Sequence, residues 1–553
     1  MFRRIIGLIL ACVLAFSAAA AEGPAGNTEK KILVIETTDL HGYIVDASSG
    51  REDRFQYRLA RIAQLINEAR ASGEYDDVLL LDGGDLYQGT PSSVMTGGAV
   101  IRAAYDVMGY DAVCLGNHEF DWGVTEYAAD PDGTMAPYML GDYFGDAKIP
   151  VLACNLYDAA TGKRVPFTRD YAVIEKAGLR IAVIGYIPDY RNDIMTSMIA
   201  PYRIDGRLGA LDRLVREVNE REKPDATIVL AHEVPLKVSP GLDPEQVDLI
   251  CGGHSHEIIA GISKEGIPCI QGNSSGNGFA SAVLVVGADG SVRAEDLKYT
   301  SVTDDRERLY DTPENAALLD PEIMAVSRAG WDAIRDEMSE VLGWIDTPVR
   351  ASREMGANSA GNWITGLFLK ATKELGTVIA FHNSGGIRTS FYIPKGQTTR
   401  TITVYDVYTI CPFGNSLLVY EINGQELGRQ LADGLRKTNC GDQMTGVTFT
   451  WTATGDDTTD RAEREYTILS AVLDDGTEVD LNDTEKLYRV CVTNFSATVS
   501  GSVFEGKEPL VPVADAPVDN EALIRVLREE SRANNGYIFV DEGPRGTEVR
   551  PAE

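Results

Sequence analysis

Basic residues are scarce in this chain of 553 residues. Lysine and arginine together number 51, against 83 aspartates and glutamates, which gives a formal net charge of -32. Nucleic-acid polymers are bound by basic surfaces, so this balance argues against a nucleic-acid partner. An anionic small molecule would be repelled by the overall field. Such a substrate would need metal ions or local arginines to attract it.

Cysteines are few and form no CxxC pair. Of the eight, Cys12 lies in the N-terminal segment, and the remaining seven are widely scattered. Cys114, Cys154, Cys251 and Cys491 lie in apolar runs, where we expect them to be buried thiols of the core. We therefore predict no disulfide framework.

Long hydrophobic runs are confined to the N-terminus, at residues 5–16. Arg3 and Arg4 precede this run, and small residues suited to cleavage follow it at 18–21. The pattern predicts a signal peptide over residues 1–21. The run is too short for a confident membrane span, although an uncleaved anchor or a lipid on Cys12 are alternatives. We expect a periplasmic or secreted protein without a membrane span.

The length and the apolar pattern predict more than one domain. A chain of 553 residues exceeds one ordinary core. Short apolar runs alternate with helical spacings in the first half, which predicts an α/β class. We expect a first domain over residues 28–300 that ends in a hairpin. A linker with a helix at 322–342 would follow over 301–342, and a second domain over 343–545.

Polar side chains follow several predicted strands of the first domain. The carboxyl ends of strands in an α/β sheet are where catalytic groups converge. Asp39 and His41 alternate with Leu40, so an extended segment would point both the same way. The candidates found in this way are Asp39, His41, Asp85, Asn117, His118, Asp121, His232, His254 and His256.

Histidine is rare, and its placement favours metal binding. Five of the six histidines follow these strands, and only His382 lies in the second half. Each motif alone is compatible with a polar turn or a structural histidine, but together they offer enough nitrogen and oxygen ligands for two ions. A carboxylate shared between them would hold the ions about 3.5–4 Å apart, as in hydrolytic two-metal sites.

The second half offers groups suited to a phosphate and a base. A strand at 378–381 leads into His-Asn-Ser-Gly-Gly-Ile-Arg, where backbone amides and Arg388 could meet a phosphate. A glycine turn with a solvated arginine is the alternative. Phe413 and Phe495 fit the core, the usual place of phenylalanine, or a sandwich around a base.

These motifs together resemble a known family. Asp-x-His-Gly at Asp39, GGD-x-x-x-GT from Gly83, GNHEFDWG from Gly116, His232, and GGHSH from Gly252 resemble the calcineurin-like metallophosphoesterases. With NSGGIR and PFGN, the chain resembles the secreted 5′-nucleotidase/UDP-sugar hydrolase family over nearly all of its mature length. The resemblance implies a four-layered metallophosphoesterase β-sandwich flanked by helices, followed by an α+β substrate-binding domain.

The resemblance also implies roles for single residues. One divalent metal would be held by Asp39, His41, Asp85 and His256, and a second by Asp85, Asn117, His232 and His254. His118 would lie beside the attacked phosphorus, with Asp121 orienting its ring. The substrate-binding residues would be Asn383, Arg388, Phe413, Phe495 and Arg353. Such ligands suit zinc, manganese or iron.

The expected reaction is hydrolysis of nucleoside 5′-monophosphates by a water activated by two metal ions, with the nucleoside on the C-terminal domain. Two departures from the family pattern bear on the substrate. Asn494 continues as FSATVSGSVF without the family's ribose-binding aspartate, and Arg353 is further from Gly361-Asn362 than usual. UDP-sugars, dinucleotides, 2′,3′-cyclic nucleotides and a sulfur compound are therefore alternative substrates. A non-catalytic nucleotide-binding surface protein is the alternative from another class, but no expected metal ligand is missing.

Overall fold

The computed structural model describes residues 29–49, 51–122, 149–191, 193–352, 358–437, 441–455 and 459–550. The predicted signal segment and Arg353 lie outside these ranges. The first part of the chain contains two six-stranded sheets. In sheet order, the first consists of β14 (Val292–Ser301), β13 (Gly278–Val286), β1 (Lys30–Thr37), β2 (Asp77–Asp82), β3 (Ala112–Cys114) and β4 (Val151–Leu152). The second consists of β11 (Ile258–Ile262), β12 (Pro268–Gly272), β10 (Leu249–Cys251), β9 (Ala226–Ala231), β7 (Leu179–Tyr186) and β6 (Tyr171–Lys176).

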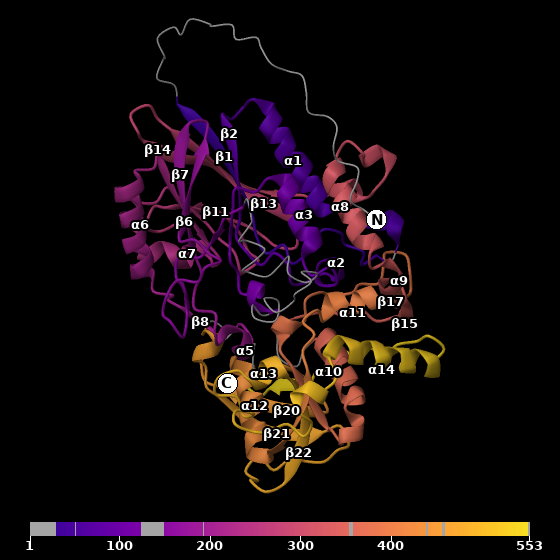
Figure 1. Ribbon diagram of the computed structural model, residues 1–553. Helices are drawn as coiled ribbons and strands as arrows, with labels where there is room; N and C mark the ends of the chain where they lie inside the picture. The colour runs from indigo at the N-terminus through magenta and orange to yellow at the C-terminus, as the bar shows by residue number, and fades with distance from the viewer. Residues whose placement is uncertain are drawn as a thin grey trace, which may run out of the picture.

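The two sheets are packed between helices, which gives four layers (Figure 1). Alternating residues of β7 show why. Ile181 and Val183 belong to the core between the sheets, whereas Ala182 and Ile184 pack with the helix on the outer face. Successive side chains of a strand point to opposite faces, so a strand buried on both sides is apolar throughout. The helices of this part are α1 (Arg58–Ser72), α2 (Pro91–Val94), α3 (Ala99–Met108), α5 (Thr196–Ile199), α6 (Leu208–Glu222), α7 (Pro235–Val238) and α8 (Pro321–Asp332).

The second part has its own mixed sheet with helices on both sides. The sheet order is β18 (Leu417–Asn423), β22 (Leu487–Thr493), β16 (Ile379–His382) and β19 (Gln443–Thr445). Its helices are α10 (Ser359–Ala371), α11 (Val404–Ile410), α12 (Gly424–Arg436), α13 (Asn494–Ala497) and α14 (Asp519–Ala533). Smaller sheets pair β15 (Val341–Ile345) with β17 (Arg400–Thr403), β5 (Leu156–Asp158) with β8 (Tyr202–Ile204), and β21 (Tyr466–Leu473) with β20 (Val447–Ala453) and β23 (Gly546–Glu548). The α/β class and the two-part architecture that the sequence predicts are confirmed.

Two local predictions were wrong. Residues 322–342 do not form one helix: α8 ends at Asp332, the short α9 (Arg335–Met338) follows, and β15 begins at Val341. In β15, Leu342 and Ile345 are buried while Val341 and Trp344 are exposed, because the strand pairs with β17 instead of packing as a helix. The segment around Asp39 is not extended either, since Asp39 and His41 have φ of 50° and 48°.

The cysteines and the helix lengths were two further subjects of the sequence predictions. Six cysteines within the described residues are buried and free of disulfide bonds, and Cys440 lies outside those residues. Across the part of the chain that the structure describes, no helix combines the length and apolar character needed to cross a membrane.

Gly185 in β7 lies where the two sheets approach closely, and it generates a stability prediction. A Cβ atom there would lie 2.3 Å from the Cβ atom and 2.4 Å from the carbonyl carbon of Leu152 in β4. Because the backbone of Leu152 is held within a sheet, we expect Gly185→Ala to lower the free energy of unfolding by about 2 kcal/mol. Urea-induced unfolding followed by circular dichroism measures this loss.

Gly209 in α6 provides the matched control. A Cβ atom at Gly209 would meet no atom within 4 Å. We expect Gly209→Ala to raise the free energy of unfolding by up to about 1 kcal/mol, because alanine favours a helix more than glycine does. Equal stability of Gly185→Ala and the wild type would contradict the close packing.

Candidate functional site

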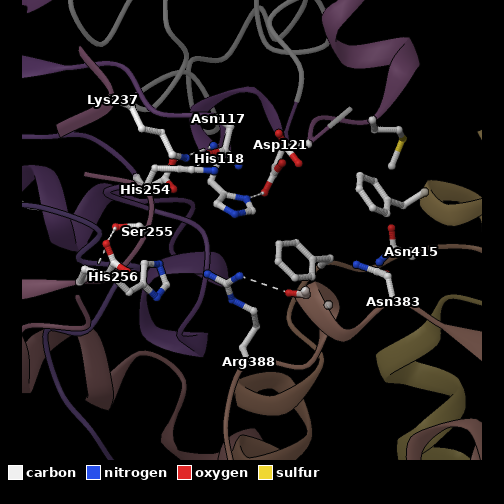
Figure 2. A pocket seen from close by; sticks show the side chains of 18 residues that line it. Asn117, His118, Asp121, Lys237, His254, Ser255, His256, Asn383, Arg388 and Asn415 are labelled. Atoms are coloured by element: carbon white, nitrogen blue, oxygen red, sulfur yellow. Dashed lines mark hydrogen bonds and ion pairs between the residues drawn. The ribbon is translucent and has the colours of Figure 1, made fainter. Parts of the chain in front are cut away.

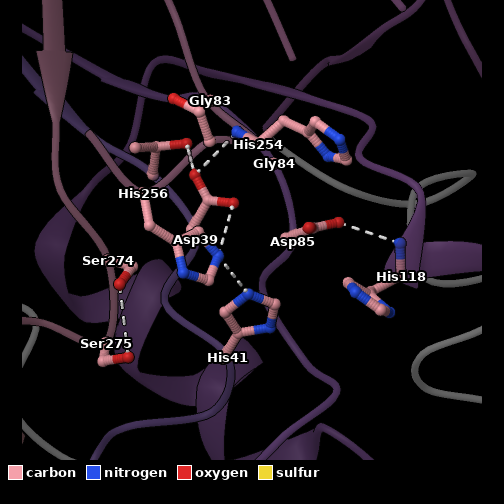
Figure 3. A network of polar contacts seen from close by, with 12 residues as sticks. Asp39, His41, Gly83, Gly84, Asp85, His118, His254, His256, Ser274 and Ser275 are labelled. Atoms are coloured by element: carbon pink, nitrogen blue, oxygen red, sulfur yellow. Dashed lines mark hydrogen bonds and ion pairs between the residues drawn. The ribbon is translucent and has the colours of Figure 1, made fainter. Parts of the chain in front are cut away.

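The ends of β1, β2, β9 and β10 meet at one edge of the sandwich and form two groups of candidate metal ligands. The first contains Asp39, His41 and His256. Nε2 of His41 lies 3.1 Å from Nε2 of His256, which in turn lies 3.4 Å from Oδ1 of Asp39 (Figure 3). The second Asp39 oxygen accepts hydrogen bonds from Thr38 and from the amide of His254. Among the residues that the structure describes, none donates a hydrogen bond to Oδ1, which is therefore available to a cation.

The second group contains Asp85, His232 and His254. Nε2 of His232 lies 3.1 Å from Oδ2 of Asp85, and Nδ1 of His254 lies 2.9 Å from Oδ1 of Asn117. The other Asp85 oxygen, Oδ1, accepts a hydrogen bond from the amide of His118 at 2.8 Å. Asn117 therefore adds a fourth candidate ligand to this group, its side-chain amide oxygen.

Backbone carbonyls fix the orientation of two of the rings. Nδ1 of His232 donates to the carbonyl oxygen of Gly83 at 2.7 Å, and Nδ1 of His41 donates to that of Gln88 at 2.8 Å. Because a carbonyl can only accept, each Nε2 is left without a proton in the neutral ring. This arrangement of a second partner behind each imidazole is typical of metal-binding histidines.

The charges around the groups favour a cation. Burial would raise the pKa of Asp39, but the neighbouring histidines, first His256, lower it to about 2. Burial, followed by the charge of Arg388, lowers the pKa of His41 well below its usual range. Burial alone would lower the pKa of His232, yet the Asp85 carboxylate raises it to about 10. A position that attracts a proton so strongly attracts a divalent cation for the same reason, so the residues fit metal ions.

Backbone strain accompanies this convergence. Asp39, His41, Asp85, His254 and His256 all have φ between 48° and 69°, a region that non-glycine residues rarely adopt. Such strain persists only where the surrounding structure enforces it, and it clusters at functional sites. The strand ends therefore turn sharply inward, and this turn brings Asp39 and His41 together in place of the extended geometry that we expected.

Two glycines permit the close packing of these loops. A Cβ atom at Gly116 would lie 2.1 Å from Oδ1 of Asp85, and one at Gly84 would lie 2.9 Å from Nδ1 of His232.

Sequence reasoning missed Glu119, whose buried carboxylate accepts hydrogen bonds from the amides of Gly116, Asp85 and Leu86. Its place inside the GNHEFDWG stretch was the available signal.

His118 and Asp121 form a separate pair beside the second group. Nδ1 of His118 lies 2.6 Å from Oδ2 of Asp121. Burial lowers the pKa of His118, but the carboxylates of Asp121 and Asp85 outweigh it and raise the pKa overall. The pair can therefore carry a proton on Nδ1 and present Nε2 to a ligand.

The second part of the chain closes the site from the other side. Nη2 of Arg388 lies 2.9 Å from Nε2 of His41, and the ring of Phe413 stacks against that of His118 with centroids 5.4 Å apart. A cavity of about 410 Å³ lies between the two parts (Figure 2). Its lining includes Asp85, Asn117, His118, Asp121, His254, His256, Asn383, Arg388, Phe413 and Phe495 from the predicted set, and Asp193, Met195, Lys237, Glu257 and Asn415 besides.

The structure therefore places the predicted site residues in one region, with Arg353 outside the described residues. Asp39, His41 and His232 lie immediately behind the cavity wall, in contact with residues that line it. Sequence reasoning also missed Gln88 and Tyr190, whose ring lies 4.7 Å from that of His254. Gln88 lies at an unspecified position of the GGD-x-x-x-GT stretch and Tyr190 lies in no quoted motif, so neither was distinguished from an ordinary core residue.

Comparisons with known proteins agree with this geometry. The family model of calcineurin-like phosphoesterases matches residues 32–257, and that of the 5′-nucleotidase C-terminal domain matches residues 339–505. The trifunctional nucleotide phosphoesterase protein YfkN of Bacillus subtilis is 26% identical over 505 residues, which cover 84% of this chain but only 31% of that protein. A 5′-nucleotidase of Vibrio cholerae is 27% identical over 482 residues, which cover 76% of this chain and 80% of that protein.

A solved structure shares the fold. The 5′-nucleotidase precursor from Thermus thermophilus superposes with a TM-score of 0.72 at 23% identity, covering 94% of this chain and 100% of that one. The two family models together span both parts of the chain, and each lies on the part whose architecture it describes. The chain therefore belongs to the family that joins a calcineurin-like phosphoesterase domain to a 5′-nucleotidase C-terminal domain.

Proposed function

We propose that this protein hydrolyses nucleoside 5′-monophosphates to nucleoside and phosphate, with two divalent cations at the strand ends. One observation carries the proposal: two groups of metal ligands adjoin a single cavity that also contains an arginine and two phenylalanines. The curated relatives named 5′-nucleotidase and nucleotide phosphoesterase support the same substrate class. Their similarity extends over 84% and 76% of this chain.

The ligand assignment follows the two groups. We assign Asp39, His41 and His256 to one cation and Asn117, His232 and His254 to the other, with Asp85 shared between them. The mixture of nitrogen and oxygen donors suits zinc, manganese or iron. When bound, such cations lower the pKa of a water molecule and neutralise charge on a phosphate.

The protein side chains supply the remaining chemistry. Protonated His118 donates a proton toward the leaving oxygen, and Asp121 holds the ring in the required orientation through Nδ1. Arg388 binds phosphate oxygens with its guanidinium group. The base lies against Phe413 and Phe495, and Asn383 offers its amide to the nucleoside.

The domain boundaries and the compartment are part of the proposal. We assign residues 28–300 to the catalytic domain, 301–342 to a linker with helices, and 343–545 to the substrate-binding domain. An export signal over residues 1–21 would place the enzyme in the periplasm or outside the cell, where nucleotides are available for breakdown.

A second cavity favours a second candidate activity. It measures about 380 Å³ and adjoins His41, His256 and Arg388 on the side away from Phe413. Six residues with hydroxyl groups are among those that line it: Tyr43, Ser274, Ser275, Ser352, Ser384 and Thr409. Such a space suits a second, polyhydroxylated substituent on the attacked phosphate, as in a UDP-sugar or a dinucleotide.

A substrate panel tests the proposed function. We expect purified protein to release phosphate from AMP and UMP, and EDTA to abolish the release until manganese or zinc is restored. Colorimetric phosphate assays and product chromatography measure this. Preferred cleavage of UDP-glucose or of a dinucleotide would favour the second candidate. No turnover of any nucleotide with added metal would contradict both and leave a binding protein.

The shared position of Asp85 generates a metal-binding prediction. We expect Asp85→Ala to lose most bound metal, because we assign its carboxylate to both ions, whereas Asp39→Ala should lose about one of two ions. Metal content of purified variants, measured by mass spectrometry, checks this. Equal losses in the two variants would contradict the shared role, whatever the substrate.

His118 lies in the cavity without belonging to either ligand group, so its loss should affect chemistry alone. We expect His118→Asn to lower kcat for AMP by a factor of about 10²–10⁴ while the metal content stays that of the wild type. Steady-state kinetics and metal analysis on the same preparation measure both. A fully active variant would remove His118 from the proton-transfer step.

A further inference from the structure

Gln88 lies at the junction of three segments that the proposed reaction uses. Its side chain is 1% exposed. Its Oε1 accepts a hydrogen bond from Nε1 of Trp122 at 2.8 Å, and its Nε2 donates to the carbonyl oxygen of Pro412 at 3.1 Å. Its own carbonyl oxygen accepts the hydrogen bond from Nδ1 of His41. One residue therefore contacts a candidate metal ligand, the catalytic loop and the substrate-binding domain.

The partners fix the orientation of this amide. An indole N–H can only donate and a carbonyl oxygen can only accept, so only one of the two amide orientations satisfies both. Each partner also adjoins a functional side chain. Trp122 directly follows Asp121, which pairs with His118, and Pro412 directly precedes Phe413, whose ring stacks on His118.

The segment that carries Gln88 is itself held firmly. The amides of His41 and Gly42 donate to the carbonyl oxygens of Asp85 and Leu86, and the amide of Thr90 donates to that of His41. On the other side of the cavity, the amide of Arg388 donates to the carbonyl oxygen of Ile410, the last residue of α11. The bond from Gln88 to Pro412 therefore reaches the segment to which both Arg388 and Phe413 are attached.

We propose that Gln88 is a positioning residue that sets the distance between the base-binding wall at Phe413 and the catalytic loop at His118 and Asp121. This inference rests on the proposed function. The base and the phosphate of a nucleotide are separated by a limited distance. A nucleotide therefore gains binding energy from both walls at once only when the distance between the walls matches that separation. A phosphate ester without a base makes no contact with the base-binding wall, so its binding energy does not depend on that distance.

Gln88→Met tests the proposal with AMP and ribose 5-phosphate as the pair of substrates. Methionine keeps the length of the side chain and removes both hydrogen bonds. We expect kcat/KM for AMP to fall at least about tenfold through a higher KM, because the buried carbonyl of Pro412 and the partly buried indole of Trp122 lose their bonds. For ribose 5-phosphate, which has the same sugar and phosphate but no base, we expect a change within about threefold.

Tyr405→Phe is the matched control. Tyr405 lies on α11, the helix that precedes Pro412, and like Gln88 it bridges the two domains. Its hydroxyl accepts a hydrogen bond from the amide of Ala47 and donates one to the carbonyl oxygen of Val45. Across the described residues, the Tyr405 hydroxyl bonds to neither the catalytic loop nor Phe413, so its removal should leave the ratio of AMP to ribose 5-phosphate activity unchanged. Trp122→Phe, which removes one of the two Gln88 bonds, should lower that ratio in the direction of Gln88→Met.

The outcomes separate the inference from the function. If Gln88→Met leaves the ratio of AMP to ribose 5-phosphate activity unchanged, either because both activities fall equally or because neither falls, the positioning role is overturned while the nucleotidase proposal stands. A wild type that releases phosphate from neither substrate would overturn the nucleotidase proposal and this inference with it. Metal content and thermal unfolding of Gln88→Met, matching those of the wild type, exclude general misfolding. If that variant does not fold, the ratio measured with Trp122→Phe decides alone.

Discussion

The buried carboxylate of Asp85 is the group on which the arrangement of the site depends. It lies between the imidazole of His232 and the amide of His118, and it is 1% exposed. A carboxylate in such a place is costly unless charges and hydrogen bonds compensate it. The missing side chain at Gly116 and the amides fixed by Glu119 let the surrounding loops approach it closely. The strained backbone of the ligand residues accompanies the sharp turns that bring these strand ends together at one edge of the sandwich.

The overall charge and the proposed substrate are reconciled by local structure. A chain with a formal charge of -32 repels a phosphate at a distance. Within the cavity, the guanidinium group of Arg388 lies beside His41, and the ligand groups favour cations. Interactions of this kind are strong because Asp39, His41 and Asp85 are buried, whereas exposed acidic residues are screened beyond about a Debye length. The sign of the surface therefore tells little about the sign of the ligand.

The sequence predicted much of this site because ligands that follow buried strands share one sheet edge. His232 and Asp85 are far apart in the sequence, yet each lies within three residues of the end of a strand whose apolar run is easy to recognise. Local geometry was harder to predict. The turn at Asp39 and His41 depends on backbone bonds to Asp85 and Leu86, which are distant in the sequence. The same holds for β15, whose partner β17 lies far along the chain, and for Glu119 and Gln88, whose roles exist only through tertiary contacts.

The packing between the two domains sets the position of the base-binding residues relative to the residues that act on the phosphate. One hydrophobic core includes Ile44 near the metal ligands, Trp331 of α8, and Tyr405 of α11, so it continues from the sandwich into the substrate-binding domain. Close-packed cores transmit small displacements because they leave little free space. A substitution that opens a void in this shared core would therefore alter the separation between Phe413 and the ligand groups, whereas the loss of one hydroxyl group at its edge leaves the packing in place. Selectivity for a nucleotide over a simple phosphate ester is then a property of the domain contact, whereas hydrolysis itself belongs to the strand ends of the catalytic domain.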